Sequence, residues 1–315
     1  MHHPTPHTVP TTRPEVLLAV PLPDFLRLPL EAAYTCHVLK DAQPHLGRIR
    51  AAIPLGGTVL STELLASMPA LEIVSVMGVG YDGVPIPYCR ERGIRVTNTP
   101  DVLTDDVADI AVALVLMTSR RLVESNRYLH AGSWLTGPFP LAHAVRGKTA
   151  GIFGLGRIGK AIARRLEAHG MKIAYHGRKP QNVPWAYFDD LQALAAESDF
   201  LVIACPGGPE TQKRVDAPVL AALGRDGTLI NIARGSVVDE AALITALRAG
   251  TIRGAGLDVF EDEPRVPAEL LACENAVLLP HVGSATHETR LAMANLVLEN
   301  LAAHFAGREL ITPVC

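Results

Sequence analysis

The chain has 315 residues, of which 48% are hydrophobic, and its formal net charge is −3. A single hydrophobic core rarely supports so long a chain, so we expect two domains of roughly 100–200 residues each. The nearly balanced charge provides no basic field that could hold a polyanion, and nucleic acid is therefore not an expected partner.

The cysteines and the N-terminus bear on the cellular compartment. The five cysteines are odd in number, lie far apart and form no close pair of the kind found in metal sites or disulfide frameworks. The N-terminal residues MHHPTPHTVPTTRP lack a signal-peptide core, and no later segment is long enough in apolar residues to span a bilayer. We expect a soluble cytoplasmic protein with a frayed, proline-rich start and no membrane partner.

Short apolar runs alternate with helical or turn-forming stretches in the first hundred residues. They are EVLLAV from Glu15, YTCHVL, and LEIVSVMG from Leu71. This alternation predicts a small parallel βα domain. Residues 105–127 then carry apolar residues at helical spacing, which predicts one long helix bridging two domains.

A second alternation of strands and helices follows this helix. Its strand-like runs are KTAGIFG, MKIAYHG, FLVIACP, GTLINIAR, AGLDVF and AVLLPH. Strands interleaved with helices predict an α/β domain with a doubly wound parallel sheet of the Rossmann type. A last helix is expected from near Ser284 to Gly307, and it could return to pack on the first domain.

Gly154, Gly156 and Gly159 form a GxGxxG pattern between the strand TAGIF and the helix RIGKAIARRL. Glycines there allow a tight turn and a close approach of the backbone to a pyrophosphate, whose charge the helix N-terminus stabilises. We therefore assign residues 101–285 to a dinucleotide-binding domain. We expect residues 1–100 and 286–315 to form a smaller, flavodoxin-like domain, which would then hold the substrate.

The end of the next strand indicates which dinucleotide is bound. About twenty residues after the first glycine, an NAD site places an acid on the ribose 2′-hydroxyl. This chain has His176, Gly177, Arg178 and Lys179 there. An arginine can hold a 2′-phosphate that a carboxylate would repel, so the predicted cofactor is NADP(H). The alternative is that Arg178 and Lys179 form only a solvated turn.

Ligands of an open parallel sheet bind beyond the carboxyl ends of its strands. The residues that follow successive strand-like runs should therefore lie at that edge. They are Cys205 and Pro206, Arg234, Asp258 with Glu263, and His281. A protonated histidine can donate to a carbonyl that receives a hydride, and it acts as a base in the reverse direction. We expect Glu263 to orient His281. We expect the planar guanidinium of Arg234 to bind a substrate carboxylate through two N–H groups. Each of these residues alone could be an ordinary loop residue.

Several stretches of the chain resemble signatures of the D-isomer-specific 2-hydroxyacid dehydrogenase family. The stretches GIFGLGRIGKAIA, LINIARGSVVDE, GLDVFEDEP and LLPHVGSAT resemble its successive signatures, and VMGVGYDGV and NTPDVLTDDVAD resemble its substrate-domain motifs. The resemblance implies a catalytic trio of Arg234, Glu263 and His281. It also implies that Asp258 holds the nicotinamide carboxamide, and that N–H groups around Val79 and Gly80 bind the substrate carboxylate.

The resemblance also completes the expected cofactor site. Thr104 would lie on the nicotinamide side, and Ile158 near the pyrophosphate. The full expected set is Thr104, Gly154, Gly156, Arg157, Ile158, Gly159, His176, Arg178, Lys179, Cys205, Pro206 and Asp258.

Within the family, YHGRKP and ACPGGPET look most like the NADPH-dependent glyoxylate and hydroxypyruvate reductases. Two alternatives stay open: a reductase of a larger 2-oxo acid such as hydroxyphenylpyruvate, and a non-enzymatic, nucleotide-sensing protein similar to corepressors. A homodimer is implied by analogy. Trp134 and Phe139, in GSWLTGPFPLAHAV, lie in a region that resembles a dimer contact reaching toward the partner's cleft, where either residue could touch substrate.

Overall fold

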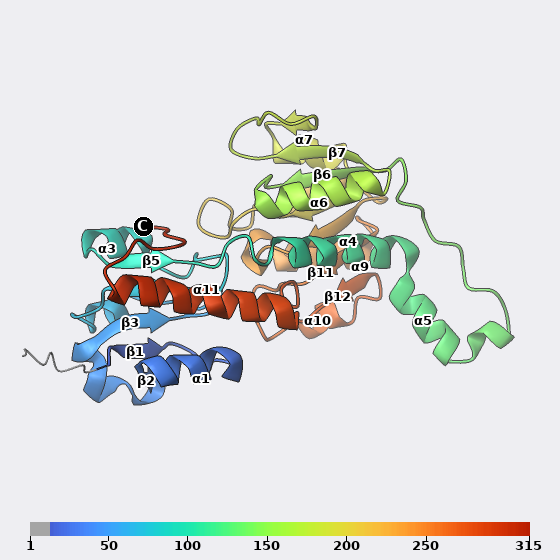
Figure 1. The fold of residues 1–315 in the computed structure, drawn as a ribbon. Coiled ribbons are helices and arrows are strands. Elements are labelled where there is room, and N and C mark those ends of the chain that lie inside the picture. The colour runs from blue at the N-terminus through green and yellow to red at the C-terminus, as the bar shows by residue number, and fades with distance from the viewer. Residues whose placement is uncertain (1–12) are drawn as a thin grey trace, which may run out of the picture. The chain divides into compact units, whose positions relative to one another are not determined.

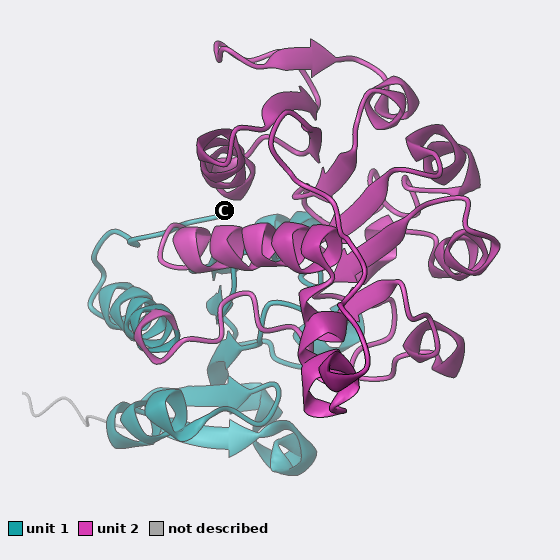
Figure 2. Ribbon diagram, turned by 90° about the vertical axis from the view of Figure 1, so that its right-hand side faces the viewer, with its two compact units in different colours: residues 1–100, 290–315 teal, residues 101–289 magenta. Residues whose placement is uncertain are grey.

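The computed structural model describes residues 13–315, which divide into two compact units (Figure 2). Unit 1 comprises residues up to 100 together with 290–315, and unit 2 comprises residues 101–289. The sequence places the second boundary at residue 285, whereas unit 2 continues to Thr289. Residues 1–12 of the expected frayed start lie outside the described part of the chain.

Unit 1 contains a five-stranded parallel sheet with the strand order β2-β1-β3-β4-β5. Its strands are β1 (Glu15–Leu18), β2 (Thr35–Val38), β3 (Ile49–Ile53), β4 (Ile73–Ser75) and β5 (Arg95–Thr97). This is the strand order of flavodoxin-like folds, which confirms the predicted smaller parallel domain.

The helices and turns of unit 1 surround this sheet. They are α1 (Asp24–Ala33), η1 (Leu39–Asp41), η2 (Gln43–Arg48), α2 (Thr62–Ala66), α3 (Ile86–Glu91) and most of α11 (His287–Phe305). Alternate strand residues such as Leu17, Ala52 and Val74 are fully buried and pack with Leu65 and Met68. The period of two along each strand therefore supplies this core.

Unit 2 contains a seven-stranded parallel sheet with the order β12-β11-β10-β9-β6-β7-β8. Figure 1 labels β6, β7, β11 and β12 of this sheet. Its strands are β6 (Thr149–Phe153), β7 (Lys172–His176), β8 (Ala186–Phe188), β9 (Phe200–Ile203), β10 (Thr228–Asn231), β11 (Gly254–Leu257) and β12 (Ala276–Leu278). Because β6 lies between β7 and β9, the chain order reverses direction at β6, as in a Rossmann-type sheet.

The helices of unit 2 cover both faces of this sheet. They are α4 (Thr104–Arg120), α5 (Leu122–His130), η3 (Ser133–Leu135), α6 (Arg157–Ala168), α7 (Leu191–Ala196), α8 (Ala217–Leu223), η4 (Gly235–Val237), α9 (Glu240–Ala249) and α10 (Ala268–Leu271). Helices α4 and α6 pack on each other, with α4 against β10 to β12 and α6 against β6 and β7.

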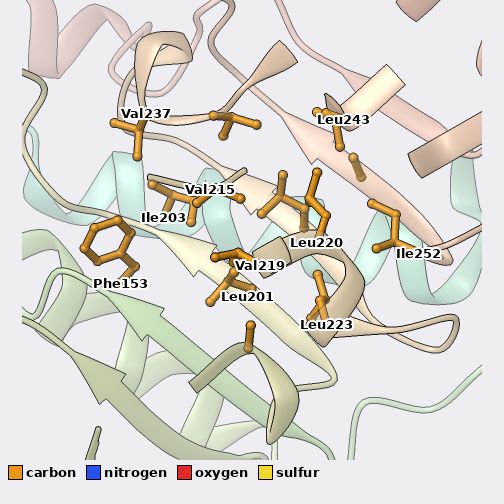
Figure 3. Packing of buried hydrophobic residues seen from close by; sticks show 14 of the residues in the cluster. Phe153, Leu201, Ile203, Val215, Val219, Leu220, Leu223, Val237, Leu243 and Ile252 are labelled. Carbon is orange, nitrogen blue, oxygen red and sulfur yellow. The ribbon is translucent and has the colours of Figure 1, made fainter. Parts of the chain in front are cut away.

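The two faces of the unit 2 sheet are set by alternation along its strands. Leu201 and Ile203 join the cluster formed with α7, α8 and α9 (Figure 3). Gly256 belongs to the other face, because a methyl group added there would lie 3.0 Å from Leu114 of α4. Both faces are buried, which explains why the strands read as continuous apolar runs.

The bridging segment differs from the prediction. A single helix over 105–127 was expected, and this is wrong, because α4 ends at Arg120 and α5 begins at Leu122. Arg121 between them adopts a left-handed conformation with φ of 52°. The apolar spacing continues across the break and no glycine or proline marks it, so the sequence pattern conceals it.

The sequence predicted no membrane-spanning segment and no disulfide framework. No helix in the described part of the chain is long and apolar enough to cross a membrane. All five cysteines are described, and each is a free thiol.

Candidate active site

The glycine pattern forms the loop between β6 and α6, and two of its glycines are required by close packing. Gly154 has φ of 101°, and a methyl group there would lie 2.5 Å from the Cα of Cys205, in the loop after β9. A methyl group at Gly159 would lie 2.2 Å from the carbonyl oxygen of Gly154. These two positions therefore bring the loop against its own helix and the neighbouring strand end.

Gly156 serves a different purpose from the other two. A methyl group there would meet nothing within 4 Å, so the space beside it is open. Gly156 is also the N-cap of α6, and no side chain caps this helix. An open glycine at an uncapped helix N-terminus is the arrangement that a pyrophosphate requires, so the residues present fit a dinucleotide.

The turn after β7 contains the residues that we expect to bind the 2′-phosphate of the adenosine ribose. The Nδ1 atom of His176 lies 2.9 Å from the carbonyl oxygen of Phe188, which fixes this ring to β8. Arg178 and Lys179 are exposed at the tip of the turn. The side-chain amide of Gln181 donates to the carbonyl oxygen of Leu155 at 2.9 Å, which ties the turn to the glycine loop.

Gln181 is a residue that sequence reasoning missed. Its backbone N–H donates to the hydroxyl of Tyr175 at 2.7 Å, and Tyr175 is fully buried in β7. The hydroxyl of Tyr187 in β8 donates to the carbonyl oxygen of Gly177 at 3.2 Å. No local pattern signals these long-range bonds, although two tyrosines flanking a basic turn are an available hint.

The catalytic candidates follow neighbouring strands of unit 2. Arg234 follows β10, Asp258 follows β11 and His281 follows β12, and the register of these three parallel strands aligns their ends. The structure brings His281 and Glu263 into contact, since the Nδ1 atom of His281 lies 2.6 Å from Oε2 of Glu263. An ionised carboxylate only accepts hydrogen bonds, so Nδ1–H donates and Nε2 is left to face a substrate.

The environment of Glu263 keeps it ionised. Its Oε1 atom accepts the backbone N–H of Phe260 at 3.0 Å. Burial alone would raise the pKa of Glu263, but the hydrogen bond from His281, the charges of His281 and Arg234 and the Phe260 N–H outweigh it and hold the pKa below its usual value. Glu263 is therefore a permanent negative charge beside the imidazole at neutral pH.

Asp258 holds the loop that carries His281. Its Oδ1 and Oδ2 atoms accept the backbone N–H groups of Val282 and Gly283, both at 2.7 Å. His281 itself has φ of 52°, which is uncommon for a residue other than glycine, so these bonds stabilise an otherwise unfavourable backbone. Burial raises the pKa of Asp258, although the two N–H donors and the charge of His281 act in the opposite direction.

Asn231 organises the loop that carries Arg234, and sequence reasoning also missed it. Its amide donates to the carbonyl oxygen of Arg234 at 2.9 Å and its Oδ1 accepts the N–H of Ala233 at 3.0 Å. A methyl group at Gly235 would lie 1.9 Å from the carbonyl carbon of Phe260, so the loops after β10 and β11 touch. A buried asparagine ending an apolar strand is the signal that could have revealed this role.

The other expected cofactor residues lie on the same set of elements. Cys205 is buried after β9, and burial raises the pKa of its thiol to about 12, so it remains neutral. Arg157 and Ile158 open α6, and Arg157 pairs with Asp101 at 2.9 Å on the surface. Pro206 follows β9, and Thr104 begins α4, where its N–H donates to the carbonyl oxygen of Asp101 at 3.0 Å.

The expected carboxylate-binding residues belong to unit 1. Val79 and Gly80 follow β4, and the side-chain amide of Asn98 donates to the carbonyl oxygen of Val79 at 2.8 Å. Within residues 13–315, the N–H groups of these two residues donate to no protein acceptor. Both groups therefore remain able to bind an anion.

The two aromatic residues of the segment after α5 differ from each other. Phe139 packs against Tyr128 with ring centroids 5.4 Å apart, and the guanidinium of Arg121 lies over its ring. Trp134 is 68% exposed. Trp134 is therefore the more exposed of the two, and Phe139 is partly covered by its own chain.

A glycine loop built for a dinucleotide and a carboxylate–histidine pair, both on one parallel sheet, define a nicotinamide-dependent oxidoreductase. A family model narrows this class. The model for the NAD binding domain of the D-isomer specific 2-hydroxyacid dehydrogenases matches residues 112–283, and the chain belongs to that family.

Relatives of known activity match almost the whole chain. A glyoxylate/hydroxypyruvate reductase A of Arabidopsis thaliana is 48% identical over 95% of this chain and 98% of its own length. A hydroxyphenylpyruvate reductase of Plectranthus scutellarioides is 51% identical over 84% of this chain and 85% of its own. An NADPH-dependent glyoxylate/hydroxypyruvate reductase of Sinorhizobium meliloti, solved with NADP and malonate, is 46% identical with a TM-score of 0.91, over 96% of this chain and 97% of its own.

Proposed function

We propose that this protein reduces a small 2-oxo acid, glyoxylate or hydroxypyruvate, to the D-2-hydroxy acid with NADPH. The observation that carries the proposal is the contact between His281 and Glu263, next to the positively charged Arg234. The activities of the Arabidopsis and Sinorhizobium relatives support the choice of substrate.

Each residue of the trio has a distinct task in this proposal. Bound NADPH supplies the hydride. His281 donates a proton from Nε2 to the carbonyl oxygen as negative charge develops there, and Glu263 stabilises the protonated imidazole and fixes its orientation. Arg234 binds the substrate carboxylate, and the N–H groups of Val79 and Gly80 remain its predicted additional donors.

The remaining cofactor assignments follow the same logic. Asp258 accepts two backbone N–H groups, and each carboxylate oxygen has capacity for a further donor, so the predicted contact with the nicotinamide carboxamide is compatible with its bonds. We assign the preference for NADPH to Arg178 and Lys179, because the turn after β7 carries these two cations and no acid.

Initial rates with a panel of substrates and both cofactors test the function. We expect the highest kcat/KM with NADPH and either glyoxylate or hydroxypyruvate, and lower values with pyruvate. Equal or better values with NADH would refute the cofactor assignment. No turnover of any 2-oxo acid would refute the enzyme and favour a nucleotide-sensing binding protein.

Hydroxyphenylpyruvate is the second candidate substrate. The hydroxyphenylpyruvate reductase relative, which is 51% identical, favours it. Competition between hydroxyphenylpyruvate and hydroxypyruvate in one assay separates the two candidates, because the preferred substrate suppresses turnover of the other according to the ratio of their kcat/KM values.

We also propose that the protein is a cytoplasmic homodimer. Its five free thiols suit a reducing compartment. The segment after α5 exposes Trp134, Leu135 and Leu141 at 68%, 93% and 97%, and a second copy is the occupant that the family resemblance implies for it. The mass measured in solution, compared between the wild type and Trp134→Ser with Leu135→Ser, tests the assembly.

A further inference from the structure

Unit 1 carries a cluster of two histidines and a glutamate that the proposed reaction does not use. Glu15 begins β1, His37 lies in β2, and His45 lies in the turn η2 that leads into β3. Glu15 pairs with Thr35 in the parallel register, and His37 stands two residues further along β2. Glu15 and His37 therefore project from the same face of the sheet.

The three side chains converge on one carboxylate oxygen. Oε2 of Glu15 lies 2.9 Å from Nε2 of His37 and 3.8 Å from Nδ1 of His45. One ligand atom from each of the three residues lies within 4.8 Å of the others. Ligand atoms about 2.0–2.2 Å from a tetrahedral zinc ion stand roughly 3.3–3.6 Å apart, a spacing close to that of the cluster.

Burial of the cluster also suits a small cation. The side chains of His37, Glu15 and His45 are 12%, 19% and 34% exposed, so the ligands are shielded on one side and open to water on the other.

Arg48 is the obvious competitor for these ligands. Its Nε atom donates to Oε1 of Glu15 at 2.6 Å, which leaves Oε2 to the histidines. Its Nη2 atom also lies 2.9 Å from Nδ1 of His45. Because the Arg48 side chain is 65% exposed, it can release His45 at little cost.

The His45 ring must also turn before it can bind a metal. It stacks on the His37 ring with centroids 4.0 Å apart and planes 20° apart, so the in-plane lone pairs of the two rings lie in separate, nearly parallel planes. His45 is the most exposed of the three ligands, and its position on a short turn allows this rotation.

We propose that Oε2 of Glu15, Nε2 of His37 and Nδ1 of His45 form a binding site for a divalent transition metal of the Zn²⁺ class, with water as the fourth ligand. Two imidazoles and one carboxylate are the donor set that zinc accepts with an open position. Every residue of this site belongs to unit 1, whereas the glycine loop and the catalytic trio belong to unit 2. The site is therefore separate in composition from the proposed active site.

The test titrates the full-length, chelator-treated protein with Zn²⁺ alone and follows the binding by calorimetry. His2, His3 and His7 in the N-terminal sequence could bind zinc by themselves, so every sample carries His2→Ala, His3→Ala and His7→Ala. We expect one zinc ion per chain. His37→Ala and His45→Ala should each weaken binding by at least about tenfold. No binding in this background, or affinities equal to those of the exposed-histidine control His143→Ala, would overturn the proposal.

Arg48→Ala separates a metal site from a simple ion-pair cluster. Removal of a competing cation about 4 Å away should tighten zinc binding by roughly fivefold, whereas weaker binding would contradict the proposal. Cobalt(II) provides a second readout, because tetrahedral coordination gives it strong visible absorption. We expect this absorption in the background protein and its loss in His45→Ala. Thermal unfolding of each variant without metal shows that the fold is retained.

Discussion

The sheet edge of unit 2 that carries Asp258, Glu263 and His281 differs from the basic turn after β7 in how its charged groups are bonded before any ligand is present. At the edge, His281 is bonded to Glu263, and Asp258 holds two N–H groups of the loop after it. At the turn, Arg178 and Lys179 are exposed, and within the described residues neither side chain has a hydrogen bond or ion pair. Groups that transfer protons are thus fixed in advance, whereas groups that bind a phosphate keep their charge unpaired until the ligand arrives.

The largest expected effect comes from removing the proton donor at the prepared edge. His281→Ala should lower kcat by about 10²–10⁴-fold, because no other group of the trio can protonate the carbonyl oxygen. NADPH affinity, measured by fluorescence titration, should remain near the wild-type value. The exposed-histidine control His169→Ala should keep full activity. A wild-type rate in His281→Ala would reject the assigned role.

A smaller effect is expected at the unpaired turn. Arg178→Ala should raise the KM for NADPH by roughly tenfold to a hundredfold, as expected for the loss of a charge-assisted bond to a phosphate. The KM for NADH should change little, since NADH has no 2′-phosphate. Arg225→Ala removes an exposed arginine elsewhere in unit 2 and serves as the control. Equal losses with both cofactors would assign Arg178 to general folding instead of cofactor choice.

Gln181 tests whether the turn needs a fixed position as well as its charge. Gln181→Leu removes the bond to the carbonyl oxygen of Leu155 while the backbone bond to Tyr175 can remain. We expect the KM for NADPH to rise by about twofold to tenfold with kcat nearly unchanged, as for one neutral hydrogen bond. Gln192→Leu, on the exposed side of α7, is the matched control. An unchanged KM would mean that the charges suffice without this support.

The sequence predicted the order of elements well where strands are buried on both faces. The runs that became β6, β9 and β10 are continuous and apolar, because helices cover both sides of that sheet. The runs that became β3, β5 and β8 were not identified. Of these, β5 and β8 have three residues each, which is too short for a period of two to stand out.

The candidate site was predictable to the extent that strand order determines it. Parallel strands end at one edge, so Arg234, Asp258 and His281 could be grouped from the sequence alone. The bonds that position them could not, because Asn231 and Gln181 act across turns without any periodic signal. The N–H groups of the His281 loop that bond to Asp258 are backbone groups, which no residue pattern identifies.

The smallest expected effect concerns the pH dependence of stability, and Glu263 determines its sign. The pKa of Glu263 lies below its usual value of 4.5 in the folded protein, so the folded state binds fewer protons than the unfolded state near that pH. Its stabilising contribution is complete above about pH 4.5 and is lost as the pH falls through the lowered folded value. Because the side chain is one-third exposed, we expect a contribution no larger than about 1 kcal/mol.

Denaturant unfolding of the wild type and Glu263→Gln between pH 7 and pH 3 measures this contribution. The stability difference between the two proteins should shrink toward acid pH, because glutamine cannot titrate. Asp258 should show the opposite dependence, because burial raises its pKa in the folded state. As the pH rises through the raised pKa, the wild type should therefore become less stable relative to Asp258→Asn. If the difference in unfolding free energy between the wild type and Glu263→Gln instead widens at acid pH, His281 does not keep this carboxylate ionised. The carboxylate–histidine pair would then not be fixed in advance of ligand binding, and the contrast with the basic turn would fail.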